Sequence, residues 1–183
     1  AGNLHSVKNA LDFLGVDSVI TKDKDEILSA DHVILHGVGS FGDAMECINN
    51  SGLYDVIKKA ADGSRPFLGI CLGLHLLFDE SEESPGVRGL GILSGKVVKI
   101  PHMGWNNIDV SKKSRILPTE SEFMYFVHSY YITPENTDVV SSYTTYGDKL
   151  GVSIERGNVF AVQFHPEKSG RTGLKILENF IKL

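Results

Sequence analysis

The residues best suited to covalent chemistry lie in two short segments far apart in the chain. Gly69, Cys71 and Gly73 form a G-x-C-x-G run between an apolar stretch and a predicted helix. Small residues two positions either side of a nucleophile relieve crowding in a sharp strand-to-helix turn. Such a turn raises Cys71 to the end of a strand, where the first turn of the helix favours the thiolate. Taken alone, Cys71 could equally be a small buried hydrophobe.

A cysteine nucleophile needs a base, and one of the seven histidines stands in a suitable context. His165 directly follows an apolar run and is followed by Pro166 and Glu167. Its imidazole can exchange protons with the reacting groups, while Glu167 can orient the ring and stabilise its cation. A lone His-Pro-Glu tripeptide is also a common loop. Together with the turn at Cys71, it predicts a nucleophile, base and orienter arrangement.

The run from Gly37 to Gly42 matches G-x-G-x-x-G and lies between a predicted strand and a predicted helix. A dinucleotide site also needs an acidic residue roughly 20 residues further on, at the end of the next strand. Asp55 falls instead in helical sequence. We therefore expect amides of this loop, from Val38 or Gly39, to join the Leu72 N–H as donors to an oxyanion near the sulfur.

Composition excludes several classes of protein. The chain has 183 residues and a formal net charge of -5, so it lacks the basic field expected of a nucleic-acid partner. Its apolar stretches, such as residues 66–70, are too short for a membrane helix. Two cysteines without an apolar leader favour a reducing cytoplasm. The histidines outside the two segments lack ligand spacing, so we expect no metal and no cofactor.

The first half of the chain alternates predicted helices and strands. The helical segments are 4–14 with Asn3 as cap and Gly15 at its end, 22–29, and 43–61 with a break near 49–52; the strands are 18–20, 32–35 and 66–70. Cys47 lies in the third helical segment and is expected in the core. This alternation is typical of an α/β fold whose ligands bind beyond the carboxyl ends of parallel strands.

The second half is rich in predicted strands. These are 96–100, 123–132, 139–146, 152–155 and 159–164, with turns at 146–148 and 156–158 that suggest hairpins. A closing helix carries Leu174, Leu177 and Ile181 on one face, with Ser169 as its expected cap. We predict one domain over residues 1–183, with a mainly parallel open sheet flanked by helices.

With these residues assembled, the sequence resembles the class I, or triad, glutamine amidotransferases, whose fold is flavodoxin-like. The resemblance covers nearly the whole chain. Within the family it is most similar to the glutaminase subunits that supply a (β/α)₈ cyclase partner. The segments that carry the resemblance are 2–7, 37–45, 69–73, 101–106, 125–131 and 164–169.

The resemblance implies that Cys71 attacks the side-chain amide of glutamine, that His165 moves the protons, and that Glu167 holds the imidazole. It also implies that the ammonia passes to the cyclase, which makes imidazole glycerol phosphate and AICAR in histidine biosynthesis. By the same resemblance, Val38 and Leu72 stabilise the oxyanion. The residues implied in binding glutamine are Gly37, Gly39, Gly73, His75, Ser129 and Tyr130; those implied at the partner interface are Pro101, His102, Met103, Gly104, Trp105 and Asn106.

Three positions depart from the family. The family begins with a strand before its Gly-Asn-Leu helix start, and this chain opens at Ala1, so we expect a first strand to be missing and the native product to be longer. His36 stands where the family loop usually begins with proline. His75 stands where glutamine is usual, which predicts altered glutamine affinity. Two alternatives remain: a stand-alone triad γ-glutamyl hydrolase, and a non-catalytic subunit that binds the partner.

Overall fold

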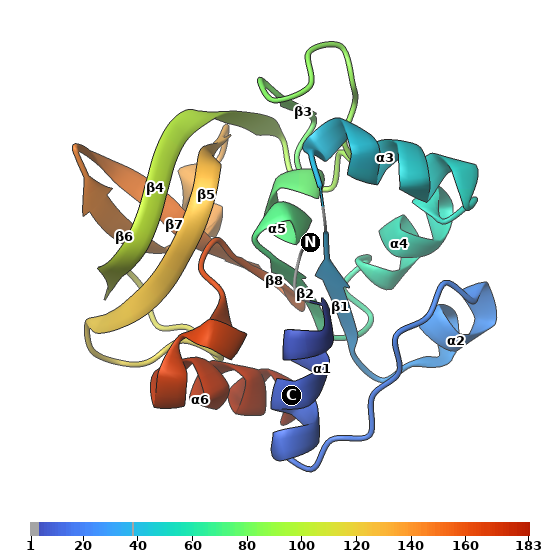
Figure 1. The fold of residues 1–183 in the computed structure, drawn as a ribbon, viewed down its shortest axis with the longest axis horizontal. Coiled ribbons are helices and arrows are strands. Elements are labelled where there is room, and N and C mark those ends of the chain that lie inside the picture. The colour runs from blue at the N-terminus through green and yellow to red at the C-terminus, as the bar shows by residue number, and fades with distance from the viewer. Residues whose placement is uncertain (1–3, 38) are drawn as a thin grey trace.

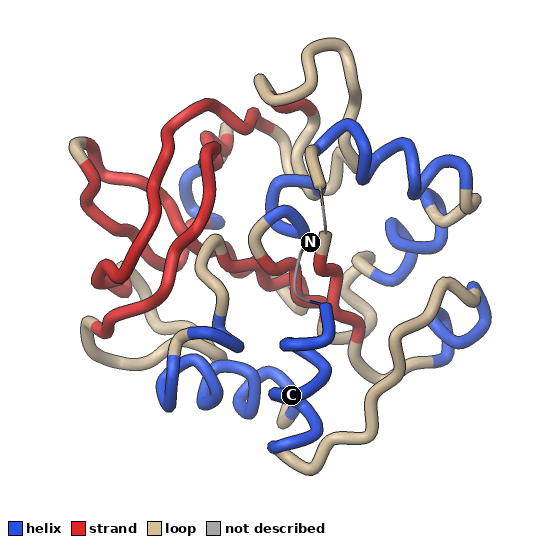
Figure 2. Tube along the Cα trace, in the orientation of Figure 1, coloured by secondary structure: helices blue, strands red, loops and turns tan. Residues whose placement is uncertain are grey.

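The computed structural model describes residues 4–37 and 39–183. Helices and strands alternate in the first half and strands dominate the second (Figures 1 and 2). The elements are α1 (Leu4–Phe13), α2 (Lys24–Ser29), β1 (Val33–His36), α3 (Phe41–Asn50), α4 (Tyr54–Ala60), β2 (Phe67–Ile70), α5 (Leu72–Leu76), β3 (Glu80–Ser81), β4 (Gly95–Val110), β5 (Glu122–Pro134), η1 (Thr137–Val139), β6 (Val140–Tyr146), β7 (Asp148–Arg156), β8 (Val159–Val162), η2 (Pro166–Lys168) and α6 (Gly170–Ile181).

A mixed sheet organises these elements in the order β1-β2-β8-β7-β6-β4-β3, with β5 paired to β4. β1, β2 and β8 run parallel, whereas β8-β7-β6 and β4-β5 are antiparallel. The β4–β5 pair forms a long ribbon beside the parallel strands (Figure 1). Cys71 and Gln163 directly follow β2 and β8, so these two parallel strands end side by side.

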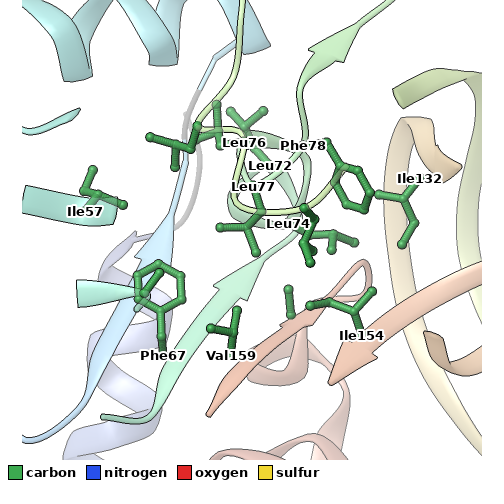
Figure 3. Packing of buried hydrophobic residues seen from close by; sticks show 14 of the residues in the cluster. Ile57, Phe67, Leu72, Leu74, Leu76, Leu77, Phe78, Ile132, Ile154 and Val159 are labelled. Atoms are coloured by element: carbon green, nitrogen blue, oxygen red, sulfur yellow. The ribbon is translucent and has the colours of Figure 1, made fainter. Parts of the chain in front are cut away.

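The parallel strands β2 and β8 are buried on both faces, as expected for a sheet covered by helices, whereas β1 is half-buried. Side chains alternate along β2, so Phe67 joins one core with α3, α4 and α5, while Leu68 and Ile70 join another with α1 and α6. Figure 3 shows the first core, where leucines of α5 pack near Phe67. Helices on both faces of the sheet confirm the expected α/β class, a single domain whose sheet is flanked by helices.

Local signals explain how several helices begin and end. α1 buries Val7, Ala10 and Leu11 and is followed by Gly15, which has a positive φ of 73°. Asn3, its expected cap, lies outside the described residues. The Asp23 side chain caps α2, and Ser40 forms a reciprocal capping box with Asp43 at α3. The expected break in the third helical segment is confirmed between α3 and α4.

Residues 18–20 do not form the predicted strand. Val19 and Ile20 are 68% and 44% exposed, and the segment runs as coil. Val19 and Ile20 are β-branched and suit a strand, but a strand needs a neighbour for its backbone groups. β1 pairs with β2 alone among the described strands, and no described strand lies beside residues 18–20.

Three further expectations are corrected. β4 continues through residues 101–106, which the sequence reading left outside any strand; the ladder with β5 is interrupted by a register shift between Lys99 and His102. Cys47 is exposed rather than in the core, because it lies on the outer side of α3. Ser169 does not cap α6 with its side chain, because its hydroxyl group bonds the Tyr125 N–H and the His165 carbonyl.

No helix in the described part of the chain is both long and apolar enough to span a lipid bilayer.

Candidate active site

The turn at Cys71 has the strained geometry of a nucleophile elbow. Cys71 is the one described non-glycine residue with a positive φ, at 51°, and its N–H donates to the Val162 carbonyl at 2.8 Å. Two glycines allow neighbouring backbone to approach. A Cβ at Gly73 would lie 1.9 Å from the Leu35 carbonyl oxygen, and one at Gly69 would lie 2.9 Å from the Gly73 backbone. Any side chain at position 73 would therefore force β1 and α5 apart.

His165 is held just beyond β8 by backbone and side-chain contacts. Its N–H donates to the Tyr125 carbonyl of β5 at 3.0 Å, and its backbone is extended, with φ -98° and ψ 98°. The following Pro166 disfavours a helical conformation at His165. His165 Nδ1 lies 2.8 Å from Glu167 Oε1, and both side chains are buried, at 8% and 0% exposure. The His-Pro-Glu turn thus forms a fixed base and orienter pair.

The fold brings the sulfur and the imidazole into one site, because Cys71 lies near enough to His165 to raise the pKa of its ring. Burial alone would lower the pKa of His165. The hydrogen bonds and charges of Cys71 and Glu167 outweigh burial and raise this pKa to about 9. Near pH 7 the ring is therefore a cation, and a cation beside the sulfur stabilises the negative charge that makes it a nucleophile.

Two further buried side chains, Gln163 and His75, are linked to the sulfur by hydrogen bonds. Gln163 Nε2 donates to Cys71 Sγ at 3.7 Å, and Gln163 Oε1 lies 2.8 Å from His75 Nε2. Burial lowers the pKa of His75 to about 4, so the ring is neutral near pH 7 and donates to Gln163. Sequence reasoning missed Gln163, although its position two residues before His165 could have indicated it.

Comparisons with known proteins agree with this geometry. The family described as glutamine amidotransferase class-I matches residues 1–183. Imidazole glycerol phosphate synthase subunit HisH of Moorella thermoacetica is 49% identical over 191 positions, which cover 100% of this chain and 90% of that protein. The chloroplastic imidazole glycerol phosphate synthase hisHF of Arabidopsis thaliana is 47% identical over 99% of this chain and 32% of its own length.

The chain belongs to the class I glutamine amidotransferases. A crystal structure of a glutamine amidotransferase has the same fold, with a TM-score of 0.78 and 22% identity over 99% of this chain and 93% of that one. As a member of this family the chain is an enzyme, a glutaminase. Neither alternative, a stand-alone γ-glutamyl hydrolase or a non-catalytic subunit, is favoured by these relatives.

In this amidotransferase the helix that follows the glycine loop, α3, begins with amides that already have hydrogen-bond partners. The first amides of α3 are already bonded: Phe41 N–H to Glu83, Gly42 N–H to Ser84 Oγ, and Asp43 N–H to Ser40 Oγ. These three amides are therefore not free to bind a phosphate. Val38, an expected oxyanion donor, lies outside the described residues. Leu72, the other, is the first residue of α5, so its N–H has no acceptor within the helix.

The residues expected to bind glutamine lie around this turn. Gly37 packs on Leu72, where an added Cβ would lie 2.7 Å from the leucine side chain, and Gly39 is exposed with a φ of 82°. His75 is 4% exposed and reaches the sulfur only through Gln163. Ser129 is exposed and Tyr130 half-buried on β5, the strand whose Val127 carbonyl lies 3.9 Å from Cys71 Sγ.

The segment expected at the partner interface alternates between two environments. Met103 and Trp105 are 75% and 57% exposed, and Pro101 is also exposed. Gly104 and Asn106 are half-buried, and Asn106 donates to the Thr145 carbonyl. His102 is buried and stacks on Phe126 and Tyr146, so it supports the ribbon from inside rather than presenting a surface. The alternation of side chains in β4 explains this difference.

The β5 strand adds apolar residues to the same face, and these were not predicted. Met103 pairs with Val127, Trp105 with Tyr125 and Asn107 with Phe123. Phe123 and Val127 are 63% and 37% exposed. Their alternation with the buried Met124 and Phe126 was the signal that could have located them. We call Met103, Trp105, Phe123 and Val127 the apolar ribbon face.

Proposed function

We propose that this chain hydrolyses glutamine with Cys71, His165 and Glu167, and passes the ammonia to the cyclase subunit of an imidazole glycerol phosphate synthase in histidine biosynthesis. The observation that carries the proposal is that Cys71 lies near enough to shift the pKa of a His165 ring that Glu167 holds in place. A nucleophile, a base and an orienter within hydrogen-bond reach are the elements of covalent acyl transfer.

In the first half of the reaction, the Cys71 thiolate attacks the side-chain amide carbon of glutamine. The tetrahedral intermediate places negative charge on the former carbonyl oxygen, and the Leu72 and Val38 amides donate to it. The His165 imidazolium gives its proton to the departing nitrogen, which leaves as ammonia. Glutamate remains bound to the sulfur as a thioester.

In the second half, neutral His165 removes a proton from water as the water oxygen attacks the thioester carbon. The carbon–sulfur bond then breaks, glutamate leaves, and the thiolate and imidazolium are restored. Glu167 keeps Nδ1 of His165 engaged throughout, so that the other ring nitrogen, Nε2, faces the reacting atoms. The Gln163 amide supports the sulfur from the other side, and His75 positions Gln163.

Two parts of the chain hold glutamine: the glycine loop with the turn at Cys71, and strand β5. Gly37, Gly39 and Gly73 bind glutamine through their backbone, and Gly37 and Gly73 also let the loop and the elbow pack closely against Leu72 and Leu35. Ser129 and Tyr130 of β5 bind the amino-acid end of glutamine, and His75 tunes affinity through Gln163. A cytoplasmic location completes the proposal, since both described cysteines are free.

The apolar ribbon face is the proposed docking surface for the cyclase, a (β/α)₈ barrel. Exposed aromatic and methionine side chains of this kind are typical anchors of protein interfaces. Two contacts through Tyr125 connect this face to His165. The Trp105 and Tyr125 rings meet edge to face at 5.9 Å, and the Tyr125 carbonyl accepts the His165 N–H. The relative from Arabidopsis thaliana, named hisHF, also supports pairing of the two functions.

The deciding experiment measures glutamine-dependent ammonia and glutamate release with and without a purified cyclase subunit. We expect release that the cyclase increases and that Cys71→Ala abolishes. Strong hydrolysis of glutamyl peptides without a partner would favour the stand-alone hydrolase instead. Cyclase binding without any glutamine turnover would favour the non-catalytic subunit. Full turnover by Cys71→Ala would refute the proposed mechanism.

A further inference from the structure

A third side chain lies beside the catalytic pair. His36 ends β1 and pairs in register with Ile70, the last residue of β2, so it stands at the same edge of the sheet as the Cys71 turn. Its ring centroid lies 5.9 Å from that of His165. One ligand atom each from His36, His165 and Glu167 can be chosen so that all three lie within 4.8 Å of one another. Because 129 positions separate His36 from His165, no sequence spacing indicated this cluster.

The hydrogen bonding of the cluster is incomplete. Among the described residues, five buried side-chain nitrogen and oxygen atoms have no hydrogen-bond partner. Three of them belong to this cluster: both ring nitrogens of His36 and Oε2 of Glu167. A buried polar atom without a partner costs about 1–3 kcal/mol. In its neutral form His36 offers one ring nitrogen with a lone pair, and Glu167 offers a second unpartnered acceptor, Oε2.

We propose that His36, His165 and Glu167 bind a zinc ion, and that this ion inhibits the glutaminase. Two imidazole nitrogens and one carboxylate oxygen are a donor set that zinc prefers, with a fourth position left for water. Zinc that binds a ring nitrogen displaces any proton on it, so binding at His165 near pH 7 releases one proton to solvent. Bond lengths of about 2.0–2.2 Å put ligand atoms of a tetrahedral site roughly 3.3 Å apart, so ligand atoms that lie up to 4.8 Å apart must approach by up to about 1.5 Å.

Inhibition follows from the proposed function, on which this inference rests. Zinc on Nε2 of His165 would occupy the nitrogen that carries protons to and from the substrate. Zinc on Nδ1 would replace the hydrogen bond to Glu167 that orients the ring. Zinc bound to either ring nitrogen of His165 would therefore inhibit glutamine hydrolysis. The site also depends on a residue that departs from the family, because proline, the usual residue at position 36, has no side-chain ligand.

Binding is tested first without catalysis, in the Cys71→Ala variant, so that the thiol contributes nothing. Titration calorimetry with zinc chloride compares this variant with versions that also carry His36→Asn, His36→Gln or His32→Asn. His32 is the matched control, because its Nε2 is buried and unpartnered but its ring packs on Phe180 instead. We expect either change at His36 to weaken zinc binding about 100-fold or more, since even supporting contacts of a metal site are worth 10–100-fold. His32→Asn should bind like the parent variant.

Inhibition is then measured in chains that retain Cys71, each relative to its own rate in the presence of a chelator. We expect zinc to inhibit the parent chain and His32→Asn at the same concentration, and His36→Asn only at a concentration about 100-fold higher. Equal zinc affinity in the His36 and His32 variants would overturn the proposal. So would equal inhibition, because zinc would then act on the thiol alone. Loss of turnover in Cys71→Ala tests the triad separately, so failure of one idea is distinguishable from failure of the other.

Discussion

The parallel strands and the β4–β5 ribbon differ in how far their side chains are exposed to solvent. All four residues of β2 are buried, and the strand ends in a strained turn that backbone contacts from β1 and β8 hold in place. The ribbon alternates buried and exposed side chains and leaves apolar groups such as Trp105 in solvent. The proposed catalytic residues therefore lie where backbone contacts hold the chain, and the proposed docking surface lies where one face of the ribbon is exposed.

The two regions meet at β5. The Tyr125 carbonyl accepts the His165 N–H, and the Val127 carbonyl lies 3.9 Å from the Cys71 sulfur. A change in the ribbon can therefore reach the catalytic groups through backbone rather than through flexible side chains. The predictions below separate the two regions, beginning with the largest expected effect.

Cys71→Ala should lower kcat for glutamine hydrolysis by about 10⁴-fold or more, because removal of a nucleophile ends covalent catalysis. Cys71→Gly should be equally inactive yet more stable than Cys71→Ala by about 1 kcal/mol, because glycine adopts a positive φ without strain. Ammonia release and urea unfolding measure the two effects. Equal stability of the two variants would show that the turn stores no strain.

Gly73→Ala should destabilise the fold by about 3 kcal/mol, because the new methyl group would overlap the Leu35 carbonyl and force apart packed backbone. Met103→Ala, in the ribbon, should change the free energy of unfolding by less than about 0.5 kcal/mol, since that side chain is mostly exposed. Chemical denaturation compares them. A small loss in Gly73→Ala would mean that β1 can yield, contrary to the rigidity ascribed to the parallel region.

Acid should destabilise both regions through buried histidines. Burial lowers the pKa of His75 to about 4 and that of His128, in β5, to about 3. Because both values lie below the 6.5 of an unfolded chain, the stability these groups contribute is present above pH 6.5 and is lost as pH falls toward 4. His75→Gln should reduce that loss by about 3 kcal/mol at pH 4. Denaturation midpoints from pH 7 to pH 4 provide the measurement.

The stability that the catalytic base, His165, contributes should show the opposite dependence on pH. Burial opposes protonation of His165, but Cys71 and Glu167 raise its pKa to about 9. Stability from this group is therefore complete below pH 6.5 and is lost as pH rises through 9. Cys71→Ala should flatten the decline, because one of the two stabilising partners is removed. An unchanged decline in that variant would assign the effect to other groups.

Trp105→Ala should weaken cyclase binding about 30-fold, which corresponds to the roughly 2 kcal/mol typical of an aromatic anchor. Calorimetric titration with the cyclase subunit measures this affinity. Lys112→Ala is the matched surface control, because Lys112 is exposed and lies outside the apolar ribbon face. Equal affinities for the two variants would place the interface elsewhere on the molecule.

The predictable parts of the structure were those set by local sequence. The turn around Cys71 depends on glycines two positions away, and the His165–Glu167 pair depends on residues two apart, so both could be read directly from spacing. The hairpin turns at Gly147 and Gly157 were predictable for the same reason, and both glycines have a positive φ. Local signals were sufficient wherever the partner group lay within a few residues.

The failures have non-local causes. Residues 18–20 have strand composition but no neighbouring strand in the described chain. Residues 101–106 contain a proline and a glycine, yet pairing with β5 makes most of them part of β4. The Gln163–His75 bond and the approach of His36 to His165 each join distant segments. Such contacts depend on register and burial, which one sequence does not specify.

The hydrogen bond from the Cys71 N–H to the Val162 carbonyl also determines when, during synthesis of the chain, the turn can be completed. The two residues are about 90 positions apart, and a ribosome adding roughly 5–20 residues per second needs on the order of 5–20 s to cover that distance. Until β8 emerges, the Cys71 N–H lacks the Val162 carbonyl that it bonds in the folded enzyme. The turn is thus completed, and the base at position 165 added, only late in the order of synthesis of these segments.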